Sequence, residues 1–450
     1  MQVKAPTHRP HAAAADYLKK RSSSGAEGYA AVTDRVASML AEIDAGGEER
    51  VKRYCRELDG WTGELVVSRS EIEEAGARLA KTTREDIAFA HQRIRDFALA
   101  QRDSLREFEV TLVPGLVAGQ RLIPVTTVGC YVPGGRFAHV ASALMSVATA
   151  RAAGVSNIIA TSPANAKRGG IHPGVLYALQ LAGADVVLAI GGAHGVAALA
   201  RGLFSGHSAD VIVGPGNAYV AEAKRLLFGR IGIDVIAGPT DTLVVADDTA
   251  DPALVTADLV GQAEHGVDSP VWLITTSRAL GEEVIRRAPG VIDSLPPASR
   301  DAATAAWRDH AEVAVVADRQ AACALCNEYA PEHLHVQAAD LDWWLKNLVN
   351  YGSLFLGEQS TVAYGDKCAG PNHILPTMGA ARYSGGLNVG KFIKTVTYQR
   401  MTTEASRELA PVAARISRLE GMEGHAMTAD IRLAKYFPDE DFDLANPETS

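Results

Sequence analysis

The sequence contains few cysteines and no long apolar run. Its five cysteines are odd in number and scattered over 450 residues, which fits a reducing compartment better than a disulfide framework. No run approaches the roughly 20 apolar residues of a membrane span, and the first residues lack an apolar core of signal-peptide length. The sequence therefore predicts a soluble, cytoplasmic protein.

Positive charge is not in excess either. The net charge of −9 argues against a general binder of nucleic acid or of anionic membranes. The composition, 47% hydrophobic and 22% charged, is globular, and the length allows two or three domains. Cys323 and Cys326 form a C-x-x-C, but the surrounding AACALCNEYA predicts a buried helix rather than a redox or zinc site.

Apolar periodicity divides the chain into helical and α/β parts. Residues 1–28 are expected to form a mobile arm, and residues 29–100 have helical spacing. From residue 129 short apolar strands alternate with helices of ten or more residues, which predicts parallel β-α-β units. A second alternation of the same kind follows, so two sheets of similar layout are expected. Beyond Tyr398 the pattern is helical again.

The segment Tyr364 to Thr377, YGDKCAGPNHILPT, is rich in groups that bind metals or transfer protons. It holds Asp366 and His373. Its Gly and Pro residues predict a loop rather than a helix interior or central strand. Such loops on α/β scaffolds commonly carry catalytic groups, although a plain surface loop is the alternative for this stretch alone.

A helix predicted over residues 251–265 ends in two further metal-capable groups. It begins with Asp251 as N-cap and Pro252 at the first helical position. Gln262 and His265 are three residues apart and therefore share one helix face. They can present an amide oxygen and an imidazole together, or form only a polar helix end stabilised by the helix dipole.

Glu332 and His333 form an adjacent acid and imidazole where one helix ends and the strand LHVQ begins. Two such groups can transfer protons at two stages of one reaction. His425 lies far away in the C-terminal helical part and could join them only through tertiary structure. A mixed oxygen and nitrogen site for Zn²⁺, Mn²⁺ or Fe²⁺ would combine Gln262, His265, Asp366 and His425.

Three Gly-rich turns accompany the first set of strands. They are GCYVPGG (129–135), GGAHG with His194 (191–195) and VGPGNAYV (213–220). Such turns let a phosphate approach the backbone N–H groups of a helix start. None follows the G-x-G-x-x-G pattern, so ordinary strand-to-helix turns are the alternative.

Seven segments in order resemble the histidinol dehydrogenase family. They are GCYVPGG, GPGNAYVAEAK, AGPT, GQAEHG, NEYAPEHL, GDKCAGPNHILPT and EGMEGH, between residues 129 and 425. The resemblance implies oxidation of a primary alcohol to a carboxylate in two NAD⁺-dependent steps through an aldehyde. It also implies one Zn²⁺ per subunit and a homodimer with shared active sites. A non-enzymatic α/β protein and a zinc hydrolase are the competing interpretations.

The resemblance implies an α/β fold of two incomplete Rossmann-like parallel-sheet domains with helical N- and C-terminal extensions. Residues 1–60 would form the N-terminal helical arm. Residues 61–128 with 240–384 would carry zinc and the catalytic groups, and residues 129–239 would bind NAD⁺. Residues 385–450 would form a C-terminal helical extension that contributes to the site of the partner subunit.

Residue roles follow from the same resemblance. His333 would accept the alcohol proton, and Glu332 would activate the water that adds to the aldehyde. The zinc ligands would be Gln262, His265, Asp366 and His425. The NAD⁺ contacts would be Tyr131, His194 and Asn217. The substrate would contact Thr240, His373 and Glu420, together with the four ligands and His333.

The substrate-contact positions depart from the histidinol-oxidising pattern at His194, Thr240–Asp241 and Lys367–Cys368. They resemble the branch that oxidises 2,3-dihydroxypropane-1-sulfonate (sulfopropanediol) to 3-sulfolactate. Lys367, His194 and Arg382 are the candidate partners of a sulfonate. Histidinol is the alternative substrate, since the carboxylate of Glu420 suits a cationic amine.

Overall fold

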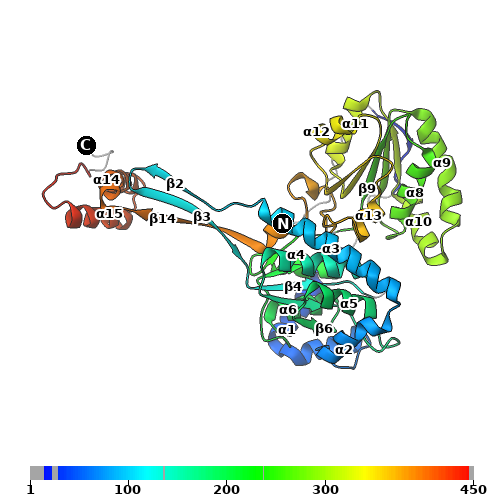
Figure 1. The fold of residues 1–450 in the computed structure, drawn as a ribbon, viewed down its shortest axis with the longest axis horizontal. Coiled ribbons are helices and arrows are strands. Elements are labelled where there is room, and N and C mark those ends of the chain that lie inside the picture. Colours follow the sequence, from blue (N-terminus) through cyan, green and yellow to red (C-terminus); the bar gives the residue numbers. More distant parts are fainter. Residues whose placement is uncertain (1–14, 23–28, 135–136, 237, 445–450) are drawn as a thin grey trace. The chain divides into compact units, whose positions relative to one another are not determined.

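The structure, a computed structural model, describes all residues except 1–14, 23–28, 135–136, 237 and 445–450 (Figure 1). It forms two compact units. Unit 1 comprises Met1–Arg102 and Val125–Phe392, and unit 2 comprises Asp103–Pro124 and Ile393–Ser450. Most of the predicted mobile arm, residues 1–28, lies outside the described residues, but Asp16–Lys19 forms a strand, β1.

The first sheet of unit 1, sheet A, has six strands in the order β1-β11-β10-β9-β12-β13. The five later strands are β9 (Thr242–Ala246), β10 (Val271–Thr275), β11 (Glu312–Val315), β12 (His333–Gln337) and β13 (Ser353–Leu356). These five are parallel, whereas β1 pairs antiparallel with β11 at the edge. Their order along the chain is 3-2-1-4-5, the arrangement of dinucleotide-binding sheets less one strand.

Helices cover both faces of sheet A. One face packs on α8 (Pro252–Ala263), α9 (Arg278–Asp293) and α10 (Pro297–Asp309). The other face packs on α11 (Arg319–Tyr329) and α12 (Leu341–Asn347). Val244 faces the first layer and its neighbour Leu243 the second. Because successive side chains point to opposite faces, a doubly covered strand is buried along its whole length, as β9 and β10 are, and only Thr242 and Thr275 at their ends are polar.

The second sheet, sheet B, repeats this topology. Its strands are β4 (Thr127–Tyr131), β5 (Asn157–Thr161), β6 (Val186–Leu188), β7 (Val211–Val213) and β8 (Gly232–Ile233). They are parallel in the order β6-β5-β4-β7-β8, again 3-2-1-4-5. One face packs on α1 (Tyr29–Leu58), α6 (Gly192–Arg201) and α7 (Ala218–Leu227).

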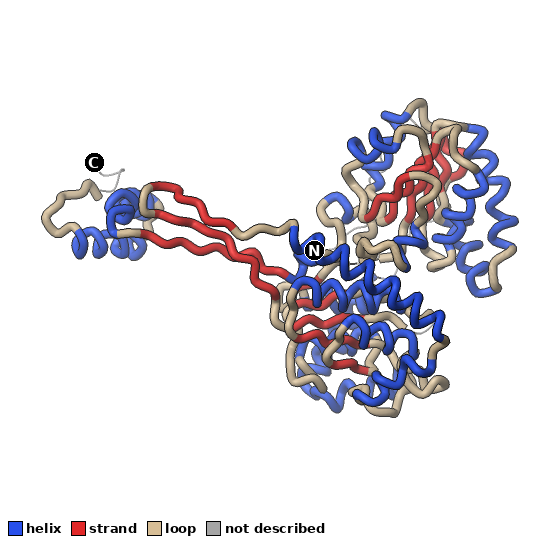
Figure 2. Tube along the Cα trace, viewed as in Figure 1, coloured by secondary structure: helices blue, strands red, loops and turns tan. Residues whose placement is uncertain are grey.

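On the other face of sheet B lie α4 (Val140–Ala153) and α5 (Pro173–Ala182) (Figure 1). The short α2 (Arg69–Glu74) and η2 (Ala75–Arg78) pack on α5, and α3 (Lys81–Asp103) follows them. The prediction of two parallel α/β sheets of similar layout is confirmed. Figure 2 colours the strands of both sheets red and the helices that cover them blue.

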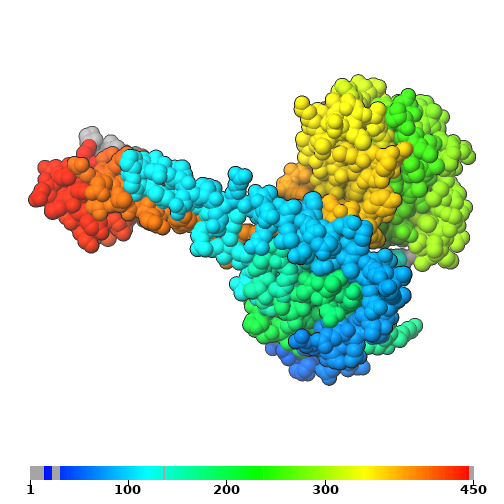
Figure 3. Space-filling view, viewed as in Figure 1, coloured from blue at the N-terminus to red at the C-terminus, as the bar shows by residue number. Residues whose placement is uncertain are grey.

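Unit 2 contains a three-stranded antiparallel sheet and two helices. The strands are β2 (Phe108–Val113), β3 (Leu116–Pro124) and β14 (Ile393–Met401), in the order β14-β3-β2. The helices α14 (Thr403–Leu419) and α15 (Glu423–Tyr436) pack through Ala410, Ala414, Ala426, Ala429 and Leu433. In Figure 3 the atoms of β2 and β3 lie beside those of β14, although β14 lies far from both strands in the sequence.

Two segments differ from the sequence-based expectation. Strand β14, which pairs with β3 of the hairpin β2–β3, falls within residues 385–450, for which helices were expected. The segment from Tyr364 was predicted to be a loop throughout, but α13 (Val362–Lys367) includes its first four residues. Gly365 lies inside this helix and does not end it. A Cβ at this position would lie 2.2 Å from the His373 ring, so the glycine lets that ring approach the helix backbone closely.

No helix of the part of the chain that the structure describes is long and apolar enough to cross a membrane. Cys323 and Cys326 lie buried in α11, as predicted. Burial raises the pKa of both thiols, which keeps them protonated and disfavours redox or metal chemistry there.

Candidate functional site

A buried polar cluster lies at the amino ends of the strands of sheet A. Its members, called here the strand-start cluster, are Glu332, His333, Asp366 and His373. His333 is the first residue of β12, and Glu332 precedes it after the end of α11. The last turn of α13 supplies Asp366, and the loop after it supplies His373. Parallel strands start at one edge of the sheet, so residues distant in sequence meet there.

Asp366 is at the centre of the cluster. His373 Nδ1 donates a hydrogen bond to Asp366 Oδ1 at 2.9 Å, and Ser353 Oγ lies 3.2 Å from His373 Nε2. His333 Nε2 lies 3.6 Å from the same carboxylate oxygen and has no hydrogen-bond partner. Atoms of His333, Asp366 and His373 lie within 4.8 Å of one another, a spacing at which they could hold a metal ion.

Burial and neighbouring charges shift the pKa values of this cluster. Burial, with the nearby Asp241 carboxyl, raises the pKa of Glu332 well above its ordinary value. Burial lowers the pKa of His333, which favours the neutral imidazole. Burial alone would raise the pKa of Asp366, but the nearby imidazoles of His333 and His373, the latter hydrogen-bonded to it, bring the pKa below its ordinary value. The cluster therefore combines one ionised carboxylate with one carboxyl that readily binds a proton.

Asp241 supports Glu332 from the start of β9. Its Oδ1 accepts from the Glu332 backbone N–H at 2.7 Å, and Glu332 Oε2 accepts from the Asp241 N–H at 3.2 Å. Asp241 Oδ2 accepts from Met378 N at 3.0 Å. Burial raises the pKa of Asp241 to about 6. Sequence reasoning noted Asp241 only as a departure from a family pattern, although an acid directly before a buried apolar strand was a usable signal.

Three of the four predicted zinc ligands lie around this cluster in unit 1. Gln262 is buried in the last turn of α8, and Thr242 Oγ1 donates to its Oε1 at 3.4 Å. The same hydroxyl lies 3.4 Å from His333 Nδ1. His265, two residues beyond α8, is close enough to help lower the pKa of His333. Gln262 and His265 thus lie next to His333, which in turn approaches Asp366.

The fourth predicted ligand, His425, lies in unit 2. Both His425, in α15, and Glu420, which caps α14, are exposed. The predicted substrate contact Thr240 instead belongs to unit 1 and donates a hydrogen bond to the Glu332 carboxyl, which lowers the pKa of Glu332 against the effect of burial. His373, also predicted to contact substrate, binds Asp366 directly.

A separate pocket lies at the carboxyl ends of the strands of sheet B. It has a volume of about 700 Å³, and Tyr131, His194 and Asn217 all line it. These are the three residues predicted to contact NAD⁺. Tyr131 ends β4, His194 is in the first turn of α6, and Asn217 is the N-cap of α7. The exposed cations Arg35 and Lys167 also line this pocket.

Protein groups already occupy the first backbone donors of α6 in this pocket. Gly192 N donates to the Tyr131 hydroxyl at 3.0 Å, and Gly191 N donates to Asp59 Oδ2 at 3.4 Å. His194 Nε2 donates to the same Asp59 oxygen at 2.9 Å, leaving the buried Nδ1 without a partner. Asp59 was missed from the sequence because it lies in the chain segment before sheet B.

The three candidate sulfonate partners have different surroundings. Arg382 donates to the backbone carbonyls of Glu328 and Gly379, and His194 pairs with Asp59. Lys367 is exposed at the end of α13. Burial, then Lys367 and His265, lower the pKa of His139, the residue before α4. His139, Lys367 and His265 are therefore neighbours, and His139 was not identified from the sequence.

The comparisons with known proteins agree with this geometry. The family model described as histidinol dehydrogenase matches residues 22–433. The chain belongs to the histidinol dehydrogenase family. It is 54% identical to the sulfopropanediol 3-dehydrogenase of Ruegeria pomeroyi, over 95% of this chain and 98% of that protein. It is 58% identical to a histidinol dehydrogenase homolog of the same organism, over 90% and 93%.

A solved structure supports the same assignment. The histidinol dehydrogenase of Elizabethkingia anophelis superposes with a TM-score of 0.86 at 30% identity, over 92% of this chain and 94% of that chain. The resemblance to the histidinol dehydrogenase family that the seven segments indicated is confirmed, and so is the α/β fold it implied. The family relatives named above are dehydrogenases.

Proposed function

We propose that this protein is a zinc-dependent NAD⁺ oxidoreductase that converts a primary alcohol to a carboxylate in two steps through an aldehyde. The observation that carries the proposal is the strand-start cluster, where a proton-binding carboxyl and a neutral imidazole adjoin metal-capable groups. A zinc hydrolase would use similar groups but leaves unexplained the pocket that Tyr131, His194 and Asn217 line.

The residues of unit 1 fit a zinc ion. Gln262 and Asp366 offer oxygen, His265 offers nitrogen, and a histidine from unit 2, His425, would complete four ligands, the usual number for zinc. The helices α8 and α13 end here, and the negative ends of their dipoles favour a cation. When bound, zinc would polarise the substrate oxygen and so assist hydride departure.

His333 would accept the proton of the alcohol. Its burial favours the neutral form near pH 7, and its Nε2 is buried without a hydrogen-bond partner, free to take a proton. Glu332 would act in the second step, where water must add to the aldehyde. Its raised pKa makes it a stronger base than an ordinary carboxylate, which suits removal of a proton from that water. The pocket of sheet B would hold NAD⁺.

Sulfopropanediol is the substrate we propose. The relative named sulfopropanediol 3-dehydrogenase is 54% identical, and Lys367, which directly follows Asp366 and is a neighbour of His139, offers a basic side chain near the site. Charged hydrogen bonds to a sulfonate would be about twice as strong as neutral ones. L-Histidinol is the second candidate, because the family includes histidinol dehydrogenases and the carboxylate of Glu420 suits an amine.

The experiment is NADH formation by the purified protein, followed by absorbance, with each alcohol in turn. Two NADH per sulfopropanediol, zinc in the protein by elemental analysis, and little turnover of histidinol are expected. Efficient oxidation of histidinol would overturn the substrate. Absence of both zinc and NADH formation with any primary alcohol would overturn the reaction.

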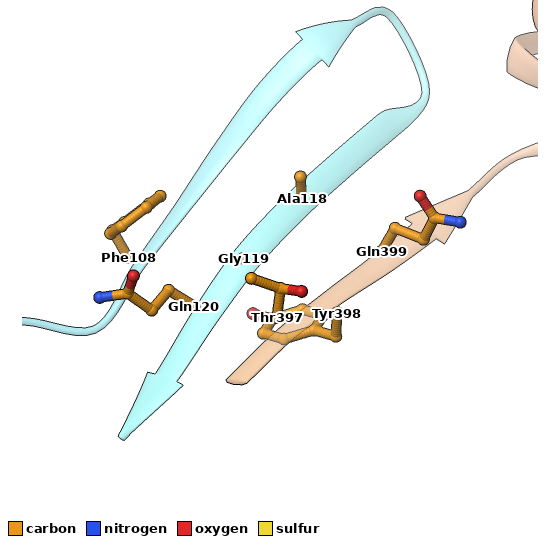
Figure 4. A pocket seen from close by; sticks show the side chains of 7 residues that line it. All are labelled: Phe108, Ala118, Gly119, Gln120, Thr397, Tyr398 and Gln399. Atoms are coloured by element: carbon orange, nitrogen blue, oxygen red, sulfur yellow. The ribbon is translucent and has the colours of Figure 1, made fainter. Parts of the chain in front are cut away.

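A homodimer with shared sites is part of the proposal, and the surface of unit 2 supports it. Strands β2 and β14 are exposed along nearly their whole length, with Phe108, Val110 and Leu112 between 43% and 60% exposed. A hollow of about 500 Å³ lies between Phe108 and Tyr398 on this sheet (Figure 4). A sheet so exposed and apolar needs a partner, and a second copy would cover it.

Subunit mixing tests whether His425 serves the partner's site. Variants His265→Ala and His425→Ala are each expected to be inactive. If unit 2 completes the partner's site, a mixed dimer has one intact site, and random mixing restores about one quarter of wild-type activity. No recovery in dimers shown to have exchanged subunits would mean that His425 serves its own chain.

A further inference from the structure

A second polar network lies beneath the strand-start cluster, on the same helix face and the same strand face. Asp258 precedes Gln262 by four residues in α8, so both project from one side of the helix. His335 follows His333 by two residues in β12, so both project from one face of the strand. The network therefore forms a layer directly below the proposed reaction groups.

Asp258 is the centre of this layer. Its Oδ2 accepts from Gln337 Nε2 at 2.6 Å and lies 3.3 Å from Nδ1 of the fully buried His335. Its Oδ1 accepts from Thr361 Oγ1 at 2.8 Å. The other ring nitrogen of His335 donates to the Gly357 carbonyl at 2.9 Å. Both oxygens of one carboxylate are thus used to join separate elements.

Each element joined by Asp258 carries a group of the proposed site. Helix α8 carries Gln262, β12 begins with His333, and Thr361 is the residue before α13, which carries Asp366. The Thr361 hydroxyl makes no capping bond to its own helix, so its bond to Asp258 is what fixes it. A shift of any of these elements would move one reaction group relative to the others.

The structure assigns Asp258 as a positioning residue that holds α8, β12 and α13 in register, and so sets the spacing of Gln262, His333 and Asp366. It acts through these groups and touches no substrate. The role of these groups rests on the proposed function, whereas the joining of the three elements does not.

The test compares Asp258→Asn with the matched control Asp247→Asn. Asp247 is also a half-buried aspartate of sheet A that accepts backbone bonds, from Thr249 N at 3.0 Å and Ala339 N at 2.9 Å. These bonds lie just beyond the carboxyl ends of β9 and β12, away from the strand starts, and involve neither α8 nor α13. For Asp258→Asn, kcat and zinc retention against a chelator are expected to fall about tenfold to a hundredfold. The KM for NAD⁺ and the midpoint of thermal unfolding should match those of Asp247→Asn.

Thr361→Val removes only the bond to α13 and gives a second measurement. Hydrogen exchange by mass spectrometry should show faster exchange of Val362–Lys367 in both Thr361→Val and Asp258→Asn, but not in Asp247→Asn. Equal kcat in the two Asn variants together with unchanged exchange of α13 would overturn the assignment. If wild-type protein binds no zinc and oxidises no alcohol, the proposed function fails, and the exchange measurement alone then decides the role of Asp258.

Discussion

The two sheets of unit 1 share one topology but place their polar groups at opposite ends. In sheet A, Glu332 and His333 lie where strands begin. In sheet B, Tyr131 and the turns before α6 and α7 lie where strands end. Parallel sheets of this order usually bind ligands at the carboxyl ends. The pocket of sheet B lies at that end, whereas the strand-start cluster of sheet A lies at the opposite end.

Helix dipoles explain why the two ends suit different ligands. Where strands begin, the covering helices end, so α8, α11 and α13 direct their negative ends toward the strand-start cluster. That field favours a metal cation. Where strands end, helices begin, and their positive ends favour the phosphates of a nucleotide. One topology used from both ends can therefore serve a metal and an anionic cofactor.

The largest expected effect separates the two reaction stages within sheet A. In Glu332→Gln, oxidation of the aldehyde should slow by about 10² to 10⁴-fold, because only that stage needs an activated water. Oxidation of the alcohol should fall much less. Single-turnover rates with alcohol and with aldehyde check this. Equal losses at both stages would remove the division of labour between Glu332 and His333.

The next prediction concerns the metal end. Loss of an outer contact of a metal site costs about 10 to 100-fold in affinity, so loss of a ligand in His265→Ala should cost at least about 10²-fold. Elemental analysis after dialysis should find the site nearly empty. The Asp59→Ala protein, altered at the other end, serves as control and should keep its zinc. Full occupancy in His265→Ala would mean that the ligand set is wrong.

The third prediction is a pH dependence of the free energy of unfolding that arises from Asp241, beside sheet A. Its folded pKa of about 6 exceeds the ordinary 3.8, so the folded state binds the proton more tightly. The free energy of unfolding should therefore fall as pH rises from about 3 to about 7, by about 3 kcal/mol from this group. Asp241→Asn lacks this term. Urea unfolding of both proteins at about pH 3 and about pH 7 should show that the free energy of unfolding of the variant, relative to the wild type, rises by that amount between the two pH values. Parallel pH profiles of the two proteins would contradict this prediction.

The smallest expected effect concerns Asp59, in the pocket of sheet B proposed to hold NAD⁺. Asp59→Ala frees the Gly191 N–H and leaves His194 without its partner. The KM for NAD⁺ should rise about tenfold, near 1.4 kcal/mol, while kcat at saturating NAD⁺ changes little. Steady-state kinetics at fixed alcohol concentration measure both. A fall in kcat with unchanged KM would place Asp59 in the chemistry instead of the cofactor pocket.

Much of the fold could be predicted because it depends on local pattern. Alternation of apolar strands with helices implies parallel β-α-β units, and Asp251 with Pro252 predicted the start of α8, where the structure has it. Strand β14 was missed because its partner, β3, lies more than 250 residues earlier in the chain. The alternation in KTVTYQ was present but too short to outweigh the helices that follow.

By itself the sequence determined the residue types and the family. Its ordered segments, from GCYVPGG to EGMEGH, carry that resemblance without any coordinates. Only the tertiary structure decided that His373 binds Asp366, that Asp241 supports Glu332, and that Asp258 joins three elements. The physical reason is that these contacts span up to about 100 residues, and parallel pairing brings such distant segments to one edge. Spacing along a chain records helix and strand faces, but not which strand edges meet.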